Sequence, residues 1–230
     1  MRYDDFIRAQ RECYFITGNQ YREIGQTTEG GQTPAPYIEQ ALGGGFRLLV
    51  NGQDVLTPAL AGSRTRDPKT KQQIYYTYEQ GVRNDDQVQF ILSSLQPGYI
   101  YLLYRGTSGG YSLLFPNQQG SIRYSAYFPY QNAATSFPQG DQSLEVSGTP
   151  GMEYLYLLLS TVPLDPEQIA RKLARSQDPA QHFDNLKAAL SPISVVERSD
   201  MTLNPDKIEC SAKYEGDFVL PIIIALPHNR

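Results

Sequence analysis

Side chains that carry most enzyme and metal chemistry are scarce in this sequence. Its 230 residues include 2 cysteines, 2 histidines, 3 methionines and no tryptophan. Metal centres need clustered histidine, cysteine or carboxylate ligands. Asp85-Asp86 is the best acidic pair, but beside Asn84 it is more simply a turn. We therefore predict no metal site, no cofactor and no catalytic residue.

The two cysteines, Cys13 and Cys210, lie far apart in the sequence. They could form a disulfide, but isolated cysteines are more often free and partly buried thiols. Side chains alternate between the two faces of a strand. In a predicted strand, Cys210 therefore shares one face with Ile208, Ala212 and Tyr214. This pattern predicts that Cys210 is a core residue.

A cysteine–histidine hydrolase needs a thiolate next to a base, and the only imidazoles are His182 and His228. His182 follows a predicted helix cap, so we expect it to face solvent. His228 lies close to the end of the sequence, where chain termini usually fray. Because no neighbouring group orients either ring, the sequence predicts that the protein is not an enzyme.

Positive charge is too sparse for a nucleic-acid-binding protein. Lys and Arg number 20 against 24 Asp and Glu, which gives a net charge of −4 and a pI of about 5.2. Phosphate binding needs concentrated Lys and Arg, so we expect no nucleic-acid partner.

Long hydrophobic runs are also missing. The strongest run, residues 218–226, is far shorter than the roughly 20 residues that span a bilayer. It fits a buried strand, with Pro221 at a bulge or an edge. Residues 1–10 lack the apolar stretch of a signal peptide. We therefore expect no membrane span and a cytoplasmic protein, with envelope association only if the sequence is part of a longer chain.

Aromatic residues and turn residues are abundant. The chain has 17 Tyr, 9 Phe, 19 Gly and 16 Pro, which favours strands joined by tight turns. In residues 87–92, apolar and polar side chains alternate, which indicates one buried face and one wet face. Similar patterns predict strands at residues 46–50, 54–57, 74–79, 87–92, 99–104, 111–115, 122–128, 143–146, 153–160, 207–214 and 217–226. Such a series predicts a mainly β protein with an antiparallel β-sandwich.

Two glycine-containing segments near the first predicted strand indicate turns. Gly43-Gly44-Gly45 is expected to break the chain before the strand at residues 46–50. Asn51-Gly52 follows that strand and predicts a type I′ hairpin turn, in which both central residues have positive φ.

The pattern becomes helical after residue 164. Asp165-Pro166-Glu167-Gln168 and Asp178-Pro179-Ala180-Gln181 each offer an Asp N-cap, Pro at the first helical position and Gln two residues later. Ser191-Pro192 ends the second predicted helix. The sequence thus predicts a two-helix insertion followed by two closing strands.

These elements suggest a division of the chain into four parts. Residues 1–45 form an N-terminal segment whose structure the sequence leaves open, and residues 46–164 form the sandwich. Residues 165–192 form the helical hairpin, and residues 193–230 form closing strands that pack on the sandwich.

Several short blocks follow one another in a specific order between residues 98 and 165. They are Gly98–Tyr104, Leu113–Asn117, Phe128-Pro129, Leu144–Val146, Gly148–Glu153 and Pro163–Asp165. Their order resembles an uncharacterised bacterial β-sandwich domain family, known mostly as an appendage of caspase-like peptidases and Ser/Thr kinases and from envelope lipoproteins. The resemblance implies a β-sandwich fold. It implies no functional residues, because the family has no established activity.

Two loops are candidates for contact with a partner, because functional contacts concentrate on loops. Gly106–Gly110 contains Thr107 and Ser108 and is predicted to be a hairpin tip, since a strand rather than the helix of a nucleophile elbow follows it. A basic loop at residues 63–71 could hold an acidic partner surface, although a solvated loop is the commoner interpretation. Its basic residues are Arg64, Arg66, Lys69 and Lys71.

We therefore expect a non-enzymatic protein-interaction or regulatory accessory module, which would serve a caspase-like or kinase signalling system in trans. Its partner would be another protein. The alternative is a β-sandwich that binds a small ligand or a glycan, since exposed tyrosine rings can stack on sugars. The tyrosines for that role are Tyr75, Tyr76, Tyr78, Tyr124, Tyr127 and Tyr130. A hydrolase of unrecognised type is the third hypothesis.

Overall fold

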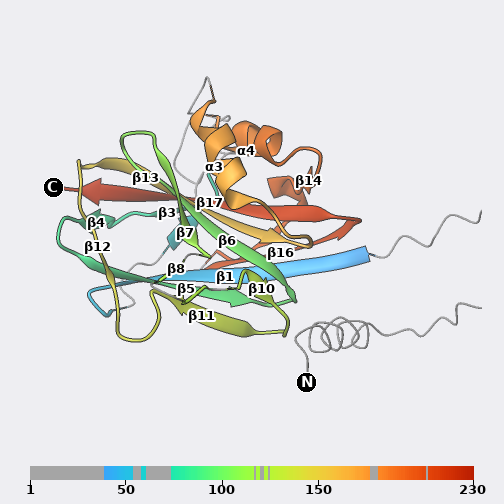
Figure 1. Ribbon diagram of the computed structural model, residues 1–230, viewed down its shortest axis with the longest axis horizontal. Helices are drawn as coiled ribbons and strands as arrows, with labels where there is room; N and C mark the ends of the chain where they lie inside the picture. The colour runs from blue at the N-terminus through green and yellow to red at the C-terminus, as the bar shows by residue number, and fades with distance from the viewer. Residues whose placement is uncertain are drawn as a thin grey trace, which may run out of the picture. The chain divides into compact units, whose positions relative to one another are not determined.

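The computed structural model describes most of the chain from residue 39 onward. The described ranges are 39–53, 58–60, 74–116, 118–119, 122–123, 125–176, 181–205 and 207–230. Cys13, the strand predicted at residues 54–57 and the basic loop at residues 63–71 lie outside them. The fold is mainly β, with two packed and mainly antiparallel sheets and two helices among these residues, so the predicted fold class is confirmed (Figure 1).

The first sheet, sheet A, has the strand order β11-β5-β1-β16-β15, with β12 beside β5. All of its pairs are antiparallel. Its strands are β1 (Glu39–Val50), β5 (Gln87–Ser94), β11 (Ala133–Phe137), β12 (Leu144–Glu145), β15 (Thr202–Leu203) and β16 (Ile208–Glu215). Alternate residues of β5 are buried, so one face of this sheet packs on the core.

The second sheet, sheet B, has the strand order β10-β6-β13-β17-β3-β2, with β7 beside β6 and with β4 and β14 beside β17. Its strands are β2 (Pro58–Leu60), β3 (Tyr76–Tyr78), β4 (Val82–Arg83), β6 (Gly98–Arg105), β7 (Tyr111–Phe115), β10 (Tyr127–Phe128), β13 (Gly151–Ser160), β14 (Ser194–Val195) and β17 (Phe218–Asn229). Only the pairs of β17 with β3, β4 and β14 are parallel. A separate short hairpin joins β8 (Gln118–Gln119) and β9 (Ile122–Arg123).

Two helices cover the face of sheet B that points away from sheet A. They are α3 (Pro166–Ala174) and α4 (His182–Leu190), and a 3-10 turn, η1 (Arg198–Asp200), follows them. In Figure 1 the two helices lie together above β6, β13 and β17. The central part of sheet B is therefore buried on both faces: β13 is buried continuously from Leu155 to Ser160, and β17 from Phe218 to Leu226.

The predicted helix starts have different outcomes. Asp165 caps α3 as expected: its carboxylate accepts a hydrogen bond from the Gln168 backbone N–H at 2.9 Å. The second helix begins later than predicted, because Gln181 is the N-cap of α4 and contributes no side-chain cap bond. Asp178 itself lies outside the described residues.

The expectation that the three glycines at residues 43–45 break the chain is wrong. They lie inside β1. Their role is to allow close packing. A Cβ on Gly44 would lie 2.8 Å from a methyl group of Leu159 in sheet B and 2.7 Å from the Ser93 carbonyl oxygen. Because no side chain fits there, glycine lets the two sheets approach each other.

The closing strands are integral parts of the two sheets. β16 pairs with β1 along eight residues, and β17 pairs with β13 along ten. Pro221 lies in the middle of β17, where a missing N–H would normally be costly. Its nitrogen points to the same side as the Val219 and Ile223 carbonyls. These accept hydrogen bonds from the backbone N–H groups of Val196, directly after β14, and Tyr75, directly before β3. Pro221 itself falls between those two short partners, so no ladder bond is lost there.

Candidate functional site

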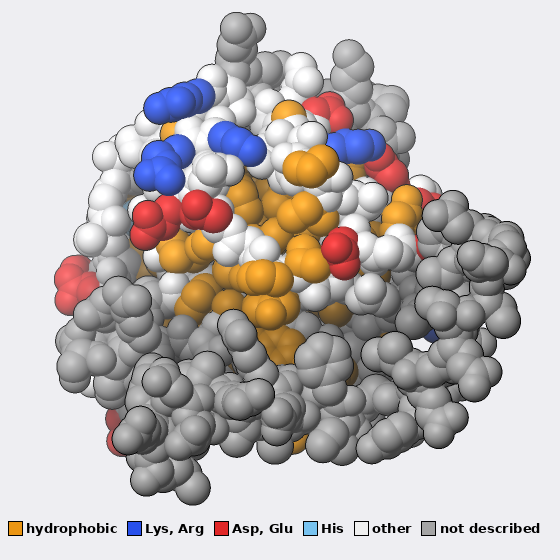
Figure 2. Space-filling model, turned by 45° about the vertical axis from the view of Figure 1, so that its right-hand side comes forward, with side chains coloured by type: hydrophobic (Ala, Val, Ile, Leu, Met, Phe, Trp, Pro, Cys, Tyr) orange, Lys and Arg blue, Asp and Glu red, His pale blue; other side chains and the backbone are white. Residues whose placement is uncertain are grey.

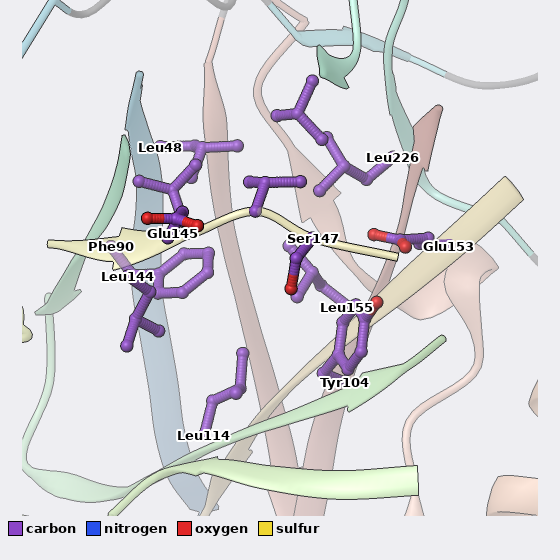
Figure 3. A pocket seen from close by; sticks show the side chains of 13 residues that line it. Leu48, Phe90, Tyr104, Leu114, Leu144, Glu145, Ser147, Glu153, Leu155 and Leu226 are labelled. Carbon is purple, nitrogen blue, oxygen red and sulfur yellow. The ribbon is translucent and has the colours of Figure 1, made fainter. Parts of the chain in front are cut away.

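An apolar cavity lies between the two sheets at the end where β4, β12 and β17 meet. Its volume is about 200 Å³. Its apolar wall comes from both sheets and from the segment after β12: Leu48, Val82, Val88, Phe90, Leu114, Leu144, Val146, Leu155 and Leu226. Figure 3 shows these side chains converging from several strands on a common space. A cavity with such walls suits an apolar ligand group.

One wall of the cavity is polar. Tyr104 and Glu153 line it, and the Tyr104 hydroxyl lies near enough to the Glu153 carboxylate for the two groups to interact. Behind Glu153, the ring nitrogen Nδ1 of His228 lies 3.1 Å from Glu153 Oε1. The other ring nitrogen, Nε2, lies 3.0 Å from Asn84 Oδ1. Glu153, His228 and Asn84 are thus joined by two hydrogen bonds beside Tyr104, at the edge of an apolar space.

Strand register explains how this chain of contacts forms. On β13, Glu153 points inward, as do Leu155 and Leu157 after it. On β17, Leu226 lies opposite Glu153, and His228 is the next inward-facing residue. The expectation that His228 frays at the chain end is therefore wrong: it is 3% exposed, because β17 continues to Asn229.

The polar side chains of this wall are held by contacts with one another. Both His228 ring nitrogens have a hydrogen-bond partner, Glu153 on one side and Asn84 on the other. Burial, together with the hydrogen bond and negative charge of Glu153, raises the pKa of Tyr104 above its ordinary value. Ser147 also lines the cavity, but no hydrogen bond joins it to a base in the described part of the chain. The wall can therefore orient a polar group of a ligand.

Cys210 lies in the core, as the sequence predicted. It is 2% exposed, forms no disulfide, and its Sγ contacts the Gly44 carbonyl oxygen at 3.8 Å. Burial raises the pKa of this thiol to about 12. A thiol that stays protonated is a poor nucleophile.

His182 is also buried, which corrects the expectation that it faces solvent. It is the first residue of α4, and its Nδ1 lies 2.7 Å from the Tyr156 hydroxyl of β13. Its ring packs on Tyr154, with the ring centroids 4.1 Å apart.

The predicted partner-contact loops fall into two groups. Gly106–Gly110 forms the hairpin tip between β6 and β7, and Thr107 and Ser108 are exposed there. The Thr107 hydroxyl donates a hydrogen bond to the Thr149 carbonyl oxygen at 3.1 Å, which ties the tip to the segment before β13. The other four residues, Arg64, Arg66, Lys69 and Lys71, lie outside the described residues.

The tyrosines proposed for sugar stacking are mostly unsuited to that role. Tyr75, Tyr76 and Tyr78 are each at most 1% exposed. Tyr127 is half-buried and packs on Tyr99, while Tyr130 is 74% exposed. Because Tyr75, Tyr76 and Tyr78 are buried, a sugar cannot stack on their rings. Tyr124 lies outside the described residues.

The acidic pair that we interpreted as a turn is a turn. Asp85 has positive φ, and the Asp86 carboxylate accepts hydrogen bonds from the Arg83 backbone N–H and the Asn51 side chain. Within the described ranges, no group of three or more His, Cys, Asp or Glu side chains could hold a metal ion. A search of the same residues finds no helix long and apolar enough to cross a membrane.

Residues 81–163 match a protein family described as a domain of unknown function, DUF4384. This match overlaps the blocks at residues 98–165 and confirms that a domain of unknown function is present. It runs from just before β4 to just after β13 and leaves out β1, β16 and β17, which lie in the interior of the two sheets. No curated protein and no solved structure matches the chain.

Proposed function

We propose that this protein is a non-enzymatic binding module that receives an apolar group of a ligand between its two sheets. The observation that carries the proposal is the cavity of about 200 Å³, lined by aliphatic and aromatic side chains with Tyr104 and Glu153 on one wall. Ligand pockets commonly combine a mostly apolar lining with a few polar groups that fix orientation.

The size and chemistry of the cavity indicate the kind of ligand. An apolar cavity of about 150 Å³ can take up a molecule of the size of benzene. The Glu153 carboxylate accepts hydrogen bonds, so a donor such as a hydroxyl or an indole N–H suits this wall. We therefore expect a small ligand, or a projecting side chain of a larger one, with an apolar body and one hydrogen-bond donor.

Indole and 1-hexanol are suitable probes, because each has an apolar body and one donor. A molecule that binds only the native state raises the melting temperature. The full chain should therefore melt at a higher temperature with either probe, and saturation-transfer NMR should show direct contact.

A blocking variant makes this test specific. Ser147 is exposed and lines the cavity, so Ser147→Trp places a large ring at its opening. Ser199 is exposed in η1 and does not line the cavity, so Ser199→Trp is the matched control. Both probes should lose their effect with the first variant and keep it with the second. Equal responses of the two variants would refute binding in the cavity.

A second candidate function is the accessory role in protein interaction that the sequence suggests. One face of the molecule gathers hydrophobic side chains at its centre, with Lys and Arg along the upper edge (Figure 2). Contiguous apolar surface rimmed by polar residues often marks a protein contact. A caspase-like or kinase system would be the partner in trans.

This second function requires a partner that binds the folded protein. The full chain, immobilised and exposed to lysate of its native host, should retain a peptidase-like or kinase-like protein. The same bait after heat unfolding is the control. Recovery of the same proteins on both baits, or of none, would argue against the accessory role.

A further inference from the structure

Arg105, the last residue of β6, lies between two tyrosine rings. Strand register makes it the direct neighbour of Tyr111 on β7 and of Tyr154 on β13. Its guanidinium carbon is 5.9 Å from the centroid of the Tyr111 ring and 5.5 Å from that of Tyr154. These distances allow cation–π contact on both sides. The pairing of three strands therefore holds the guanidinium in a fixed place.

No carboxylate partners this guanidinium in the described part of the chain, and no hydrogen bond satisfies it there. Its Nε is buried and lacks a hydrogen-bond partner. The side chain as a whole is only partly buried, so the Nη end of the guanidinium reaches solvent. An arginine ordinarily meets acceptors with several of its five donors. Here the charge is oriented but unpaired.

The rings around Arg105 are themselves fixed by contacts. The Tyr111 hydroxyl lies 3.3 Å from the Tyr156 hydroxyl, which lies 2.7 Å from His182 Nδ1. The His182 ring packs on Tyr154, so the positive end of the α4 dipole is close to the same cluster. Helix termini and guanidinium groups both favour negative charge. A rigid receptor also loses little conformational entropy when a ligand binds.

We propose that Arg105, held between Tyr111 and Tyr154, binds a carboxylate group of a ligand through its Nη edge. The planar fork of a guanidinium matches the two oxygens of a carboxylate. A single guanidinium neutralises one negative charge, so a monoanionic carboxylate fits better than a phosphate. The carboxylate can belong to a small acid or to the C-terminus of a peptide. This site is on the outer face of sheet B, so it does not depend on the cavity between the sheets.

The Nε–H group of Arg105 provides a direct measurement. Because this nitrogen is buried, its proton should exchange slowly enough to give a ¹H–¹⁵N NMR signal, and Arg105→Lys would identify the signal by removing it. We expect acetate and N-acetylglycine each to shift the Arg105 Nε–H signal saturably. Inorganic phosphate at equal ionic strength should bind more weakly than either carboxylate. Tighter binding of N-acetylglycine than of acetate would indicate a peptide C-terminus, and equal binding a small acid.

Three variants test the role of the guanidinium. Arg105→Gln removes the charge, Arg105→Lys keeps the charge but loses the fork, and Arg171→Gln on the exposed side of α3 is the control. The NMR signals of the Tyr111 and Tyr154 rings report acetate binding in every variant. We expect the affinity for acetate to fall about tenfold or more in Arg105→Gln. Arg105→Lys should bind more weakly than wild type, and Arg171→Gln should bind like wild type.

Several results would overturn the carboxylate site. One is the absence of a saturable shift with either carboxylate. Another is phosphate binding more tightly than acetate, and a third is unchanged affinity in both Arg105 variants. If Arg105→Gln does not fold, Arg105→Lys alone decides, because it retains the charge and the stem that packs between the rings.

Discussion

The two sheets differ in how many of their faces are buried, and this difference explains what the sequence shows about each. Sheet A packs one face on the core, and β5 alternates between buried and partly exposed residues. Sheet B lies between sheet A and the helices α3 and α4 (Figure 1), and the second half of β13 is buried at every position. Alternation in a sequence therefore identifies a strand with one wet face, whereas a continuous apolar run requires a cover on both sides.

The tyrosines follow the same division. Among the described residues, six tyrosines with a raised pKa lie in sheet B or directly before one of its strands: Tyr75, Tyr76, Tyr101, Tyr104, Tyr154 and Tyr156. Desolvation by burial is the largest cause in each case. In sheet A, Tyr214 of β16 is exposed. The doubly covered sheet thus withdraws ionisable hydroxyls from water, and the singly covered sheet does not.

The largest expected effect compares one leucine from each sheet. Leu157 at the centre of β13 is fully buried, so Leu157→Ala should lower the free energy of unfolding by about 2–5 kcal/mol. Leu49 is half-buried on the outer face of β1, so Leu49→Ala should cost less than about 1 kcal/mol. Urea denaturation measures both. Similar losses would mean that sheet A is covered as fully as sheet B.

The next effect is the alkaline sensitivity of sheet B. Burial raises the pKa values of Tyr75 and Tyr156 well above the ordinary value near 10. Above pH 10 the unfolded chain therefore loses protons that the native protein keeps. The stability that these groups contribute is present below pH 10 and is lost as pH rises. Above pH 10, Tyr75 and Tyr156 should each lower the free energy of unfolding by about 1.4 kcal/mol for every further pH unit.

Denaturation at several alkaline pH values tests this expectation, with tyrosinate absorbance as an independent readout. Tyr156→Phe should make the fall of the unfolding free energy with pH less steep by the contribution of one tyrosine, about 1.4 kcal/mol per pH unit. If all tyrosines titrated near pH 10 in the folded protein, the proposed difference between the sheets would be wrong.

The close approach of the two sheets at Gly44 gives a smaller effect. Gly44→Ala introduces a methyl group that meets Leu159 and the Ser93 carbonyl, so we expect a loss of about 1–3 kcal/mol. Gly110 has no positive φ, and a new methyl group there would lie 3.9 Å from the Ser108 hydroxyl oxygen, so Gly110→Ala should be near neutral. Thermal unfolding compares the two. A neutral Gly44→Ala would show that the sheets can separate there without cost.

The smallest effect concerns the helices that cover sheet B. Asp165→Ala removes the only side-chain cap bond found at the two described α-helix starts, and it should cost about 1 kcal/mol. Asp141→Ala, at an exposed turn position, is the control and should change stability little. Equal melting temperatures of the two variants would show that packing on sheet B, rather than the cap, fixes α3.

Local features of the fold were predictable because neighbouring residues determine them. Asn51 and Gly52 both have positive φ, and two hydrogen bonds join Val50 to Gln53 across the turn, as the Asn-Gly pair predicted. The Asp165 cap and the core position of Cys210 followed in the same way from short patterns. The sequence analysis did not predict β2, β4, β8, β11, β14 or β15. All of these except β11 have only two or three residues, too few to show a recognisable alternation.

The candidate site could not be predicted in the same manner. Tyr104, Glu153, His228 and Asn84 come from four separate segments, and only strand pairing brings them together. One sign was present in the sequence: His228 continues the period-two spacing of Ile222, Ile224 and Leu226. Its position near the end of the chain outweighed that pattern in our interpretation.

The sequence by itself determined that the chain forms short antiparallel strands with tight turns, a capped helix and a buried thiol, because each depends on a few adjacent side chains. Only the tertiary structure decided which polar groups meet. It placed a carboxylate and an imidazole beside an apolar cavity and an arginine between two tyrosines. The physical reason is that strand register and layer packing join residues over long separations, which no local pattern encodes.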